Sequence, residues 1–217
     1  LEMSFVEQED IFRVVENLLI KVFKKFSNKK FLYNKFPRIP FKEAMLKYAT
    51  DKPDLRNPLQ INDLTKVFER EDVKFDIFKK LVKSGSVVRS IVTKNTKDKP
   101  RSFFDNLDKW AKTEGASGMA YFTFEKDKNL TARGPVGKFF SSEALSEIME
   151  ITGAQIGDSI FFSCDKETNV LQLMSLARDK IAEELNLIDP NTFAFCWIVD
   201  YPMFEIDKVS GKIKFSH

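Results

Sequence analysis

The sequence predicts an α+β fold, and two observations predict it. Segments with apolar residues every three or four positions, which indicate amphipathic helices, alternate with short runs that indicate strands. The connections between these segments are too uneven for a regular parallel-sheet repeat. With 217 residues, 43% of them hydrophobic, the chain can bury a core and suggests one or two domains.

The first two helices are predicted from their apolar faces and their ends. Glu7 to Phe26 carries apolar residues at i, i+3, i+4 and i+7, with acids at its start and lysines at its end, where they complement the helix dipole. Pro40 can open a second helix that runs to Tyr48, because the first helical turn needs no N–H from it. Pro53 prevents any continuation of that helix.

The remaining elements are shorter and are predicted in chain order. Between residues 60 and 101 we predict a helical turn capped by Asn62 and running through Phe68, a strand in which Val73, Phe75 and Ile77 alternate with polar residues, a helical turn around Phe78–Lys83, a strand at Val87–Val92 and an exposed basic loop at Thr93–Arg101. Beyond it we predict a helix at Ser102–Glu114, a strand at Met119–Phe124, a helix capped by Ser141 or Ser142 and running through Met149, a strand at Ser159–Cys164, a helix at Thr168–Leu185, a strand at Thr192–Asp200 and a hairpin closed by Val209–Lys212.

The segment Asp51–Pro58 combines two prolines with charges of alternating sign. These charges are Asp51, Lys52, Asp54 and Arg56. Such a rigid loop either pairs its own charges as a structural corner or forms a polar wall beside a site. Because exposed charge pairs are mostly solvated, the spacing favours the structural corner.

The loop at 93–101 is the best candidate for an RNA contact by composition. Its cations are Lys94, Lys97, Lys99 and Arg101. They could neutralise phosphates, and Phe103 or Phe104 could stack on an unpaired base. The alternative, which the pattern favours, is a solvated loop followed by aromatic residues that face the core of a helix.

Few other residues suggest chemistry. Asp200 and Glu205 could suggest acid–base work or Mg²⁺ binding, although a solvated or capping role is favoured. The glycines and lysine of 132–138 lack the spacing of a phosphate-binding loop. Cys164 and Cys196 lie in apolar runs, which favours free thiols over a disulfide, and one histidine with two distant cysteines predicts no zinc site.

Charge and hydropathy restrict the partners. The net charge of +3 and the pI of about 8.7 permit an RNA partner without requiring one. The longest apolar runs, such as Phe193–Val199, fall far short of the ~20 residues that span a bilayer, so we expect no membrane partner. Together with the reduced thiols, this favours the cytoplasm.

Five segments carry a family resemblance along the whole chain. They are Leu1–Phe5 (LEMSF), Asp51–Pro58 (DKPDLRNP), the pair Gly134–Phe139 (GPVGKF) and Thr152–Phe162 (TGAQIGDSIFF), Trp197–Glu205 (WIVDYPMFE) and Lys214–His217 (KFSH). In this order they resemble bacterial-type aspartyl-tRNA synthetase, a class II synthetase. The first segment is similar to the end of the second class II motif, and the middle pair is similar to the GAD insertion domain, which GatB and GatE amidotransferase subunits share. The last two are similar to the strand returning to the catalytic core and to the start of the amino-acid-recognising loop.

The resemblance implies a nested organisation. Residues 1–60 and 187–217 resemble two pieces of the antiparallel class II catalytic sheet, and residues 61–186 resemble an inserted GAD domain of α+β type. The resemblance assigns Asp51, Lys52, Asp54 and Arg56 to structure or to positioning of the tRNA end, at the rim between core and insertion.

The resemblance also implies a reaction. The full-length parent would activate L-aspartate with ATP and Mg²⁺ and transfer it to tRNA-Asp, with tRNA-Asn left open, and it would be a homodimer. His217 matches a histidine whose imidazole can donate to the side-chain carboxylate of aspartate. The substrate carboxylate itself attacks the α-phosphate, so catalysis is positioning and charge neutralisation, and we expect no catalytic residue in this segment.

Both ends of the chain interrupt motifs. The resemblance places the phosphate-clamping arginines of the second and third motifs outside it, so we expect an internal fragment, inactive alone, with no ATP or Mg²⁺ of its own. The alternative is a stand-alone GAD-type module that binds RNA or protein, which should have ends of its own. An amidotransferase subunit is disfavoured because it leaves Asp51–Pro58 and Trp197–Glu205 unexplained.

Overall fold

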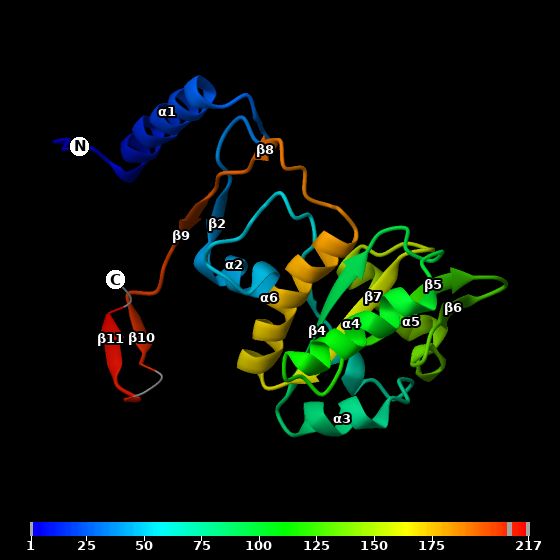
Figure 1. Cartoon of the computed structure of the whole chain (residues 1–217). Helices are drawn as coiled ribbons and strands as arrows, with labels where there is room; N and C mark the ends of the chain where they lie inside the picture. The colour runs from blue at the N-terminus through cyan, green and yellow to red at the C-terminus, as the bar shows by residue number, and fades with distance from the viewer. Residues whose placement is uncertain (1, 208–209, 216–217) are drawn as a thin grey trace.

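The computed structural model describes residues 2–207 and 210–215. Residues 61–184 form a central lobe built on a five-stranded sheet, between a first flank before it and a second flank after it. Figure 1 shows α1 (Gln8–Phe26) and the C-terminal hairpin on the side of the molecule away from this sheet. The two flanks meet in space although the whole lobe separates them in sequence.

The sheet of the central lobe is antiparallel throughout. Its order is β3 (Ile61–Asp63), β4 (Val87–Thr93), β7 (Ser159–Asp165), β5 (Ala120–Lys126) and β6 (Leu130–Arg133). The β4–β7 ladder runs from Val87 opposite Asp165 to Thr93 opposite Ser159. This long central pairing makes β4 and β7 the spine of the lobe.

Helices cover both faces of this sheet. The short 3-10 helix η1 (Thr65–Glu69), α3 (Asp76–Lys83), the 3-10 turn η2 (Gly137–Phe139) and α5 (Ser142–Thr152) pack on one face, and α4 (Arg101–Thr113) and α6 (Glu167–Glu184) on the other. In β7, Ile160 and Phe162 join the first cluster and Phe161 joins the second. Because both faces are buried, the strand reads as one apolar run instead of an alternation.

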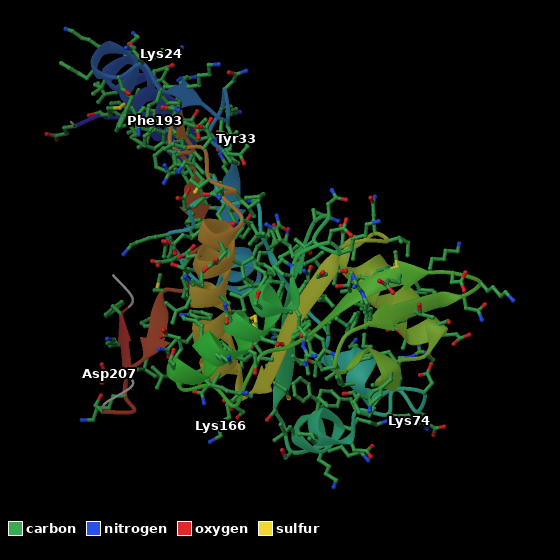
Figure 2. The ribbon with its side chains drawn as sticks, turned by 45° about the vertical axis from the view of Figure 1, so that its right-hand side comes forward. Lys24, Tyr33, Lys74, Lys166, Phe193 and Asp207 are labelled. Atoms are coloured by element: carbon green, nitrogen blue, oxygen red, sulfur yellow. The ribbon has the colours of Figure 1, made fainter. Side chains whose placement is uncertain are left out.

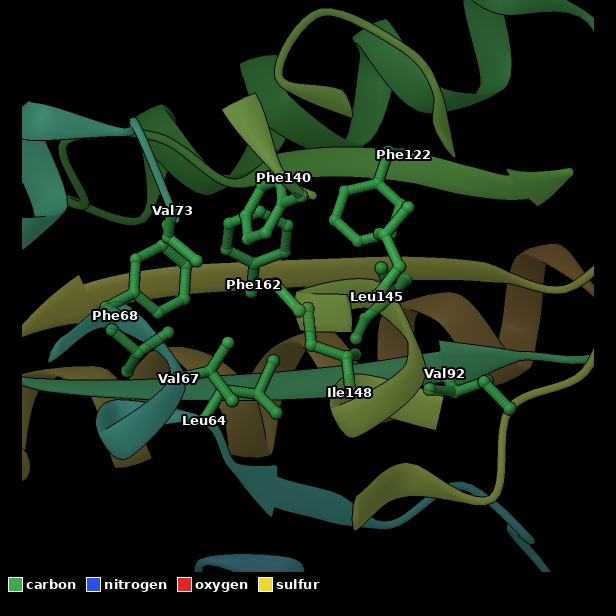
Figure 3. Packing of buried hydrophobic residues seen from close by; sticks show 14 of the residues in the cluster. Leu64, Val67, Phe68, Val73, Val92, Phe122, Phe140, Leu145, Ile148 and Phe162 are labelled. Atoms are coloured by element: carbon green, nitrogen blue, oxygen red, sulfur yellow. The ribbon is translucent and has the colours of Figure 1, made fainter. Parts of the chain in front are cut away.

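Phenylalanines dominate the first core cluster. Phe162 of β7 and Phe122 of β5 pack with Phe68 and Phe140 (Figure 3), and the ring centroids of Phe68 and Phe162 are 5.8 Å apart. Burying each such ring contributes about 1.5–3 kcal/mol, so this cluster is a principal source of the lobe's stability.

The flanks pair with each other through two short parallel ladders. β1 (Lys30–Phe31) pairs with β8 (Thr192–Phe193), and β2 (Arg38–Pro40) pairs with β9 (Trp197–Val199). These two pairs are parallel, so the antiparallel character that the resemblance implies for the catalytic sheet as a whole is not seen in them. The chain passes through the whole lobe between the paired strands, and a crossover of that length is what parallel pairing requires.

Aromatic side chains of the second flank pack against α1. Trp197 stacks on Phe12 with centroids 4.4 Å apart and donates from Nε1 to Glu16 at 2.7 Å. Phe193 lies near α1 in Figure 2, edge-on to Phe23 with centroids 4.9 Å apart. The two flanks thus share one set of apolar contacts as well as their strand pairs.

Two further elements complete the flanks. α2 (Phe41–Tyr48) contributes Ala44 and Tyr48 to a small third core cluster with Ile39 and Leu55. β10 (Phe204–Ile206) and β11 (Ile213–Phe215) form an antiparallel hairpin, as predicted. Its predicted turn at 209–212 lies partly outside the described residues.

Most predicted elements of the lobe and the first flank are confirmed, with small shifts at their ends. These are α1, α2, α3, β4, α4, β5, α5, β7 and α6. Ser141 is the cap of α5, its Oγ accepting the Ala144 N–H at 3.0 Å. These elements have strong local signals, so tertiary context did not alter them.

Predictions for short segments were wrong where contacts with distant parts of the chain determine the local structure. Val73–Ile77 forms no strand, because Val73 is buried and Phe75 packs beside α3, whereas Ile77 is 66% exposed. Asn62 lies in β3, and Asp63 holds the turn instead, accepting the Thr65 N–H at 2.9 Å. The strand predicted at 192–200 is split into β8 and β9, since each half pairs with a different strand of the first flank.

Candidate functional site

A tight segment between α2 and β3 contains the charged residues singled out by the sequence. Ala49 has a φ of +56°, and its N–H bonds the Met45 carbonyl at 3.1 Å, which ends α2 before Pro53 is reached. We call residues 50–58 the charged corner.

Asp54 and Arg56 form a forked ion pair inside the charged corner. Arg56 donates to the Asp54 carboxylate from Nη2 at 2.7 Å, from Nε at 3.0 Å and from its backbone N–H at 2.9 Å. These hydrogen bonds hold the pKa of Asp54 below its ordinary range and raise the pKa of Arg56. The two charges satisfy each other, which agrees with the structural interpretation of this segment.

Arg178 of α6 holds the backbone of the charged corner. Arg178 is 2% exposed, and its guanidinium donates to the carbonyls of Leu59 at 2.7 Å, Asp54 at 2.8 Å and Asn57 at 2.9 Å. It also lies over the Tyr48 ring, 4.8 Å from the centroid. Burial lowers the pKa of Arg178, so carbonyl dipoles and an aromatic face compensate its desolvation.

Asn57 reinforces the same contact from the corner side. Its Nδ2 donates to the Arg178 carbonyl at 3.0 Å, and its Oδ1 accepts the Leu59 N–H at 3.1 Å. Asn57 is itself buried, so both of its polar groups are used inside the protein. The corner and α6 are therefore joined from both sides.

Asp51 connects the charged corner to the second flank. The Tyr201 hydroxyl donates to Asp51 at 3.4 Å, and the Tyr201 ring lies 4.9 Å from Phe41 of α2. Burial, followed by the charge of Asp51, raises the pKa of Tyr201. Lys52 is exposed. The corner thus contacts α2, α6 and the second flank, so it is a joint between the lobe and both flanks.

The four cations predicted to contact RNA have different environments. Lys94 donates to the Asp158 carboxylate at 2.9 Å and to the Gly153 carbonyl at 2.7 Å, which fastens the loop to the lobe. Lys97 is exposed, although its backbone N–H bonds the Gly157 carbonyl at 3.0 Å. Thr93 and Thr96 are buried, so the segment is more anchored than the predicted exposed loop.

Lys99 and Arg101 line a pocket of about 400 Å³ at the start of α4. Arg133 of β6 lines it as well, and Phe104 and Tyr121 give it an apolar floor. Phe104 is buried and stacks on Tyr121 with centroids 4.8 Å apart. The aromatic residues after the loop therefore face the core, which is the favoured alternative from the sequence.

The other candidate residues lie apart from the corner and the pocket. Asp200 is exposed, and Glu205 lies in β10. His217 is outside the described residues. Cys164 and Cys196 are free thiols, as predicted, and burial raises the pKa of Cys164 to about 11.

Residues 2–207 and 210–215 hold no group of three His, Cys, Asp or Glu side chains that could bind a metal ion. Within that part of the chain, no helix has the length and apolar character needed to cross a membrane.

Sequence reasoning missed Arg178, Asn57 and Arg133. The sequence position of Arg178 could have indicated its role. It falls on the apolar stripe of α6 between Met174 and Ile181, where an arginine must find buried partners. Arg133 carried no such indication, since its place at the same pocket as Lys99 follows from strand pairing between β5 and β6.

Comparison with known proteins identifies similar sequences along the whole chain. A family described as tRNA synthetases class II (D, K and N) matches residues 1–215. The chain is 73% identical over 217 residues to the aspartate–tRNA(Asp/Asn) ligase of Pelagibacter ubique, 49% identical over 217 residues to that of Ehrlichia chaffeensis and 50% identical over 218 aligned positions to that of Wolbachia pipientis wMel. Each alignment covers all of this chain and 36% of the relative, so the chain spans about a third of the length of these relatives.

Proposed function

The chain belongs to the class II tRNA synthetases of the D, K and N group, and we propose that it serves as a segment of an aspartate–tRNA ligase. The longer protein would activate L-aspartate with ATP and transfer it to tRNA-Asp, and the names of the relatives extend the proposal to tRNA-Asn. The observation that carries this proposal is the 73% identity over both flanks and the lobe together.

We assign the parts of the chain to parts of that ligase. Residues 1–60 and 187–217 would belong to the catalytic domain, and residues 61–186 would be its GAD insertion. The lobe runs from β3 at Ile61 to the end of α6 at Glu184, and the flanks pair with each other outside it. Both features support these boundaries.

The chemistry divides between this segment and the rest of the ligase. ATP and Mg²⁺ would be held by parts of the longer protein outside this chain. His217 would donate to the side-chain carboxylate of aspartate. The charged corner would fix the rim between the catalytic domain and the insertion, because it bonds to both.

The partners of the longer protein follow from the same proposal. They would be L-aspartate, ATP and tRNA, with a second copy of the ligase as a homodimer in the cytoplasm. A stand-alone GAD-type module is the other candidate, and the similarity of both flanks to the ligases disfavours it.

A chimeric ligase tests this function. This chain would replace the matching 36% of the Pelagibacter ubique ligase, from which it differs at about a quarter of its positions. We expect the chimera to catalyse aspartate-dependent exchange of pyrophosphate with ATP and to charge tRNA with aspartate. The 217-residue chain alone should show no exchange.

Lysine and asparagine are the matched controls, since the family includes enzymes of all three types. A chimera that melts like the intact ligase but gives no exchange with aspartate would contradict the proposal. So would a preference for either control amino acid.

A further inference from the structure

The pocket at the start of α4 has a charged rim without an acid among its lining residues. Its lining consists of Lys99, Arg101, Phe104, Tyr121, Thr123, Arg133, Gly134 and Pro135. The neighbouring pocket, which shares Tyr121 and Pro135, is lined by Asp105, Asp108 and Lys112. Adjacent hollows of the same lobe therefore differ in charge, and the first one favours an anion.

The two arginines of this rim form ion pairs that are exposed to solvent. Arg101 pairs with Asp105 at 3.2 Å and is 81% exposed. Arg133 pairs with Glu125 at 2.7 Å, donates from Nη2 to the Lys97 carbonyl at 2.5 Å and is 58% exposed. Exposed pairs of this kind contribute little, so both guanidiniums can turn to a ligand at small cost. Lys99 lies beside them, 5.8 Å from the Phe103 ring.

Lys94 shows the contrast within the same loop. Its partner Asp158 is 2% exposed and also accepts the Asn95 N–H at 2.9 Å. Moving Lys94 to a ligand would leave a buried carboxylate without its cation, which is costly. Lys94 is therefore a structural residue, and the available charge lies at Lys99, Arg101 and Arg133.

The neutral polar groups of the pocket are already used. The Tyr121 hydroxyl donates to Asp105 at 2.9 Å, and the Thr123 hydroxyl is 2.8 Å from that of Ser159. Both hydroxyls are engaged inside the lobe, so the groups left to meet a ligand here are the cations. Cations that meet phosphate oxygens are the usual contact to the nucleic-acid backbone.

Gly134 sets the shape of this pocket. Its φ is +147°, and a Cβ there would lie 3.0 Å from the Phe122 Cα and from the Tyr121 carbonyl oxygen. The chain leaving β6 therefore lies directly against β5, and this close approach brings Arg133 to the same pocket as Lys99 and Arg101.

We propose that Lys99, Arg101 and Arg133 form a binding site for a backbone phosphate of RNA. The pocket volume of about 400 Å³ lies within the range of about 300–1,000 Å³ typical of ligand sites. The choice of RNA over a free nucleotide rests on the proposed function.

Titration of the 217-residue chain with a tRNA-Asp transcript over a series of salt concentrations tests this site. In one variant Lys99→Gln, Arg101→Gln and Arg133→Gln are combined. In the matched control Lys109→Gln, Lys126→Gln and Lys128→Gln remove the same charge from exposed positions of the lobe outside the pocket lining. Circular dichroism verifies that both variants remain folded.

We expect the pocket variant to bind tRNA about tenfold more weakly and to reduce the slope of log K against log salt by about 1, because one phosphate contact is lost. The control variant should stay within about twofold of the original chain. AMP at millimolar concentration should not displace tRNA.

Three results would overturn the site. The first is an equal weakening of tRNA binding in both variants. The second is displacement of tRNA by AMP, which would reassign the pocket to a free nucleotide. The third is the absence of tRNA binding by the original chain at low salt. None of these affects aspartate-dependent exchange by the chimeric ligase, which uses no tRNA, so the two proposals fail separately.

Discussion

Arg178 connects the central lobe to the first flank through three backbone carbonyls. Such a contact does not depend on which side chains the corner carries, since it is made to the main chain of Asp54, Asn57 and Leu59. The cost of removing it is correspondingly high, because the carbonyl of Leu59 and its neighbours would lose their donor in a buried place.

Replacing Arg178 by Met tests this at the level of one residue. Met keeps much of the aliphatic volume and removes every donor, so we expect Arg178→Met to lower the free energy of unfolding by at least about 2 kcal/mol. Lys180→Met is the control, since Lys180 forms ion pairs with Glu183 and Glu184 at the surface and its loss should cost less than about 1 kcal/mol. Equal losses in urea denaturation would contradict the role of Arg178.

Asp72 gives the stability of the lobe a dependence on pH. It accepts from Arg70 at 2.7 and 2.8 Å and from the Ser141 hydroxyl, and these bonds hold its pKa far below the ordinary value of 3.8. A carboxyl with a lowered folded pKa stabilises the fold above its unfolded pKa and loses that effect as pH falls through the folded pKa.

We therefore expect the free energy of unfolding to fall as the pH drops below about 4, and to fall less steeply in Asp72→Asn. The effect is moderated because the Asp72 side chain is 36% exposed. Urea midpoints measured from neutral pH to about pH 2 would show it, and parallel curves for the two proteins would count against it.

Elements that their own residues favour could be predicted from the sequence, whereas elements that depend on distant segments could not. α5 was predicted with its cap because Ser141 and the apolar spacing after it suffice locally. β6 was not predicted, because Leu130–Arg133 is only four residues long and becomes a strand by pairing with β5. The charged corner was located from its prolines and charges, whereas the residue that holds it comes from α6, far along the chain.

Two glycines are needed for different reasons, one for lack of space and the other for its backbone conformation. Gly137 lies in the short turn after β6, and a Cβ there would overlap the Ala132 carbonyl, so Gly137→Ala should force the turn away from β6 and cost about 1–3 kcal/mol. Gly153 ends α5 with a φ of +65° and open space around it, so Gly153→Ala should cost only the left-handed strain of about 1–2 kcal/mol.

Thermal unfolding distinguishes the two cases when each alanine variant is compared with the matching serine variant. The larger side chain should add to the loss at Gly137, where space is lacking, and add little at Gly153. A further loss of the same size at both sites would contradict the packing argument.

For the whole molecule, the organisation is nested. The flanks pair through ladders of two and three residues. Their third cluster has four buried residues from the first flank, and partly buried residues of the second flank, Ala194, Cys196 and Ile198, pack against it. The lobe has the seven-residue β4–β7 ladder and two larger clusters. Regions with fewer buried contacts open at lower free energy, so the flanks should open before the lobe.

Hydrogen exchange of the whole chain measures this organisation directly. We expect the amides of β2 and β9 to share one opening free energy, with the same dependence on urea, and the amides of β4 and β7 to share a higher one. Different opening free energies for β2 and β9, or one common value for all four strands, would contradict the division into paired flanks and a separately cored lobe.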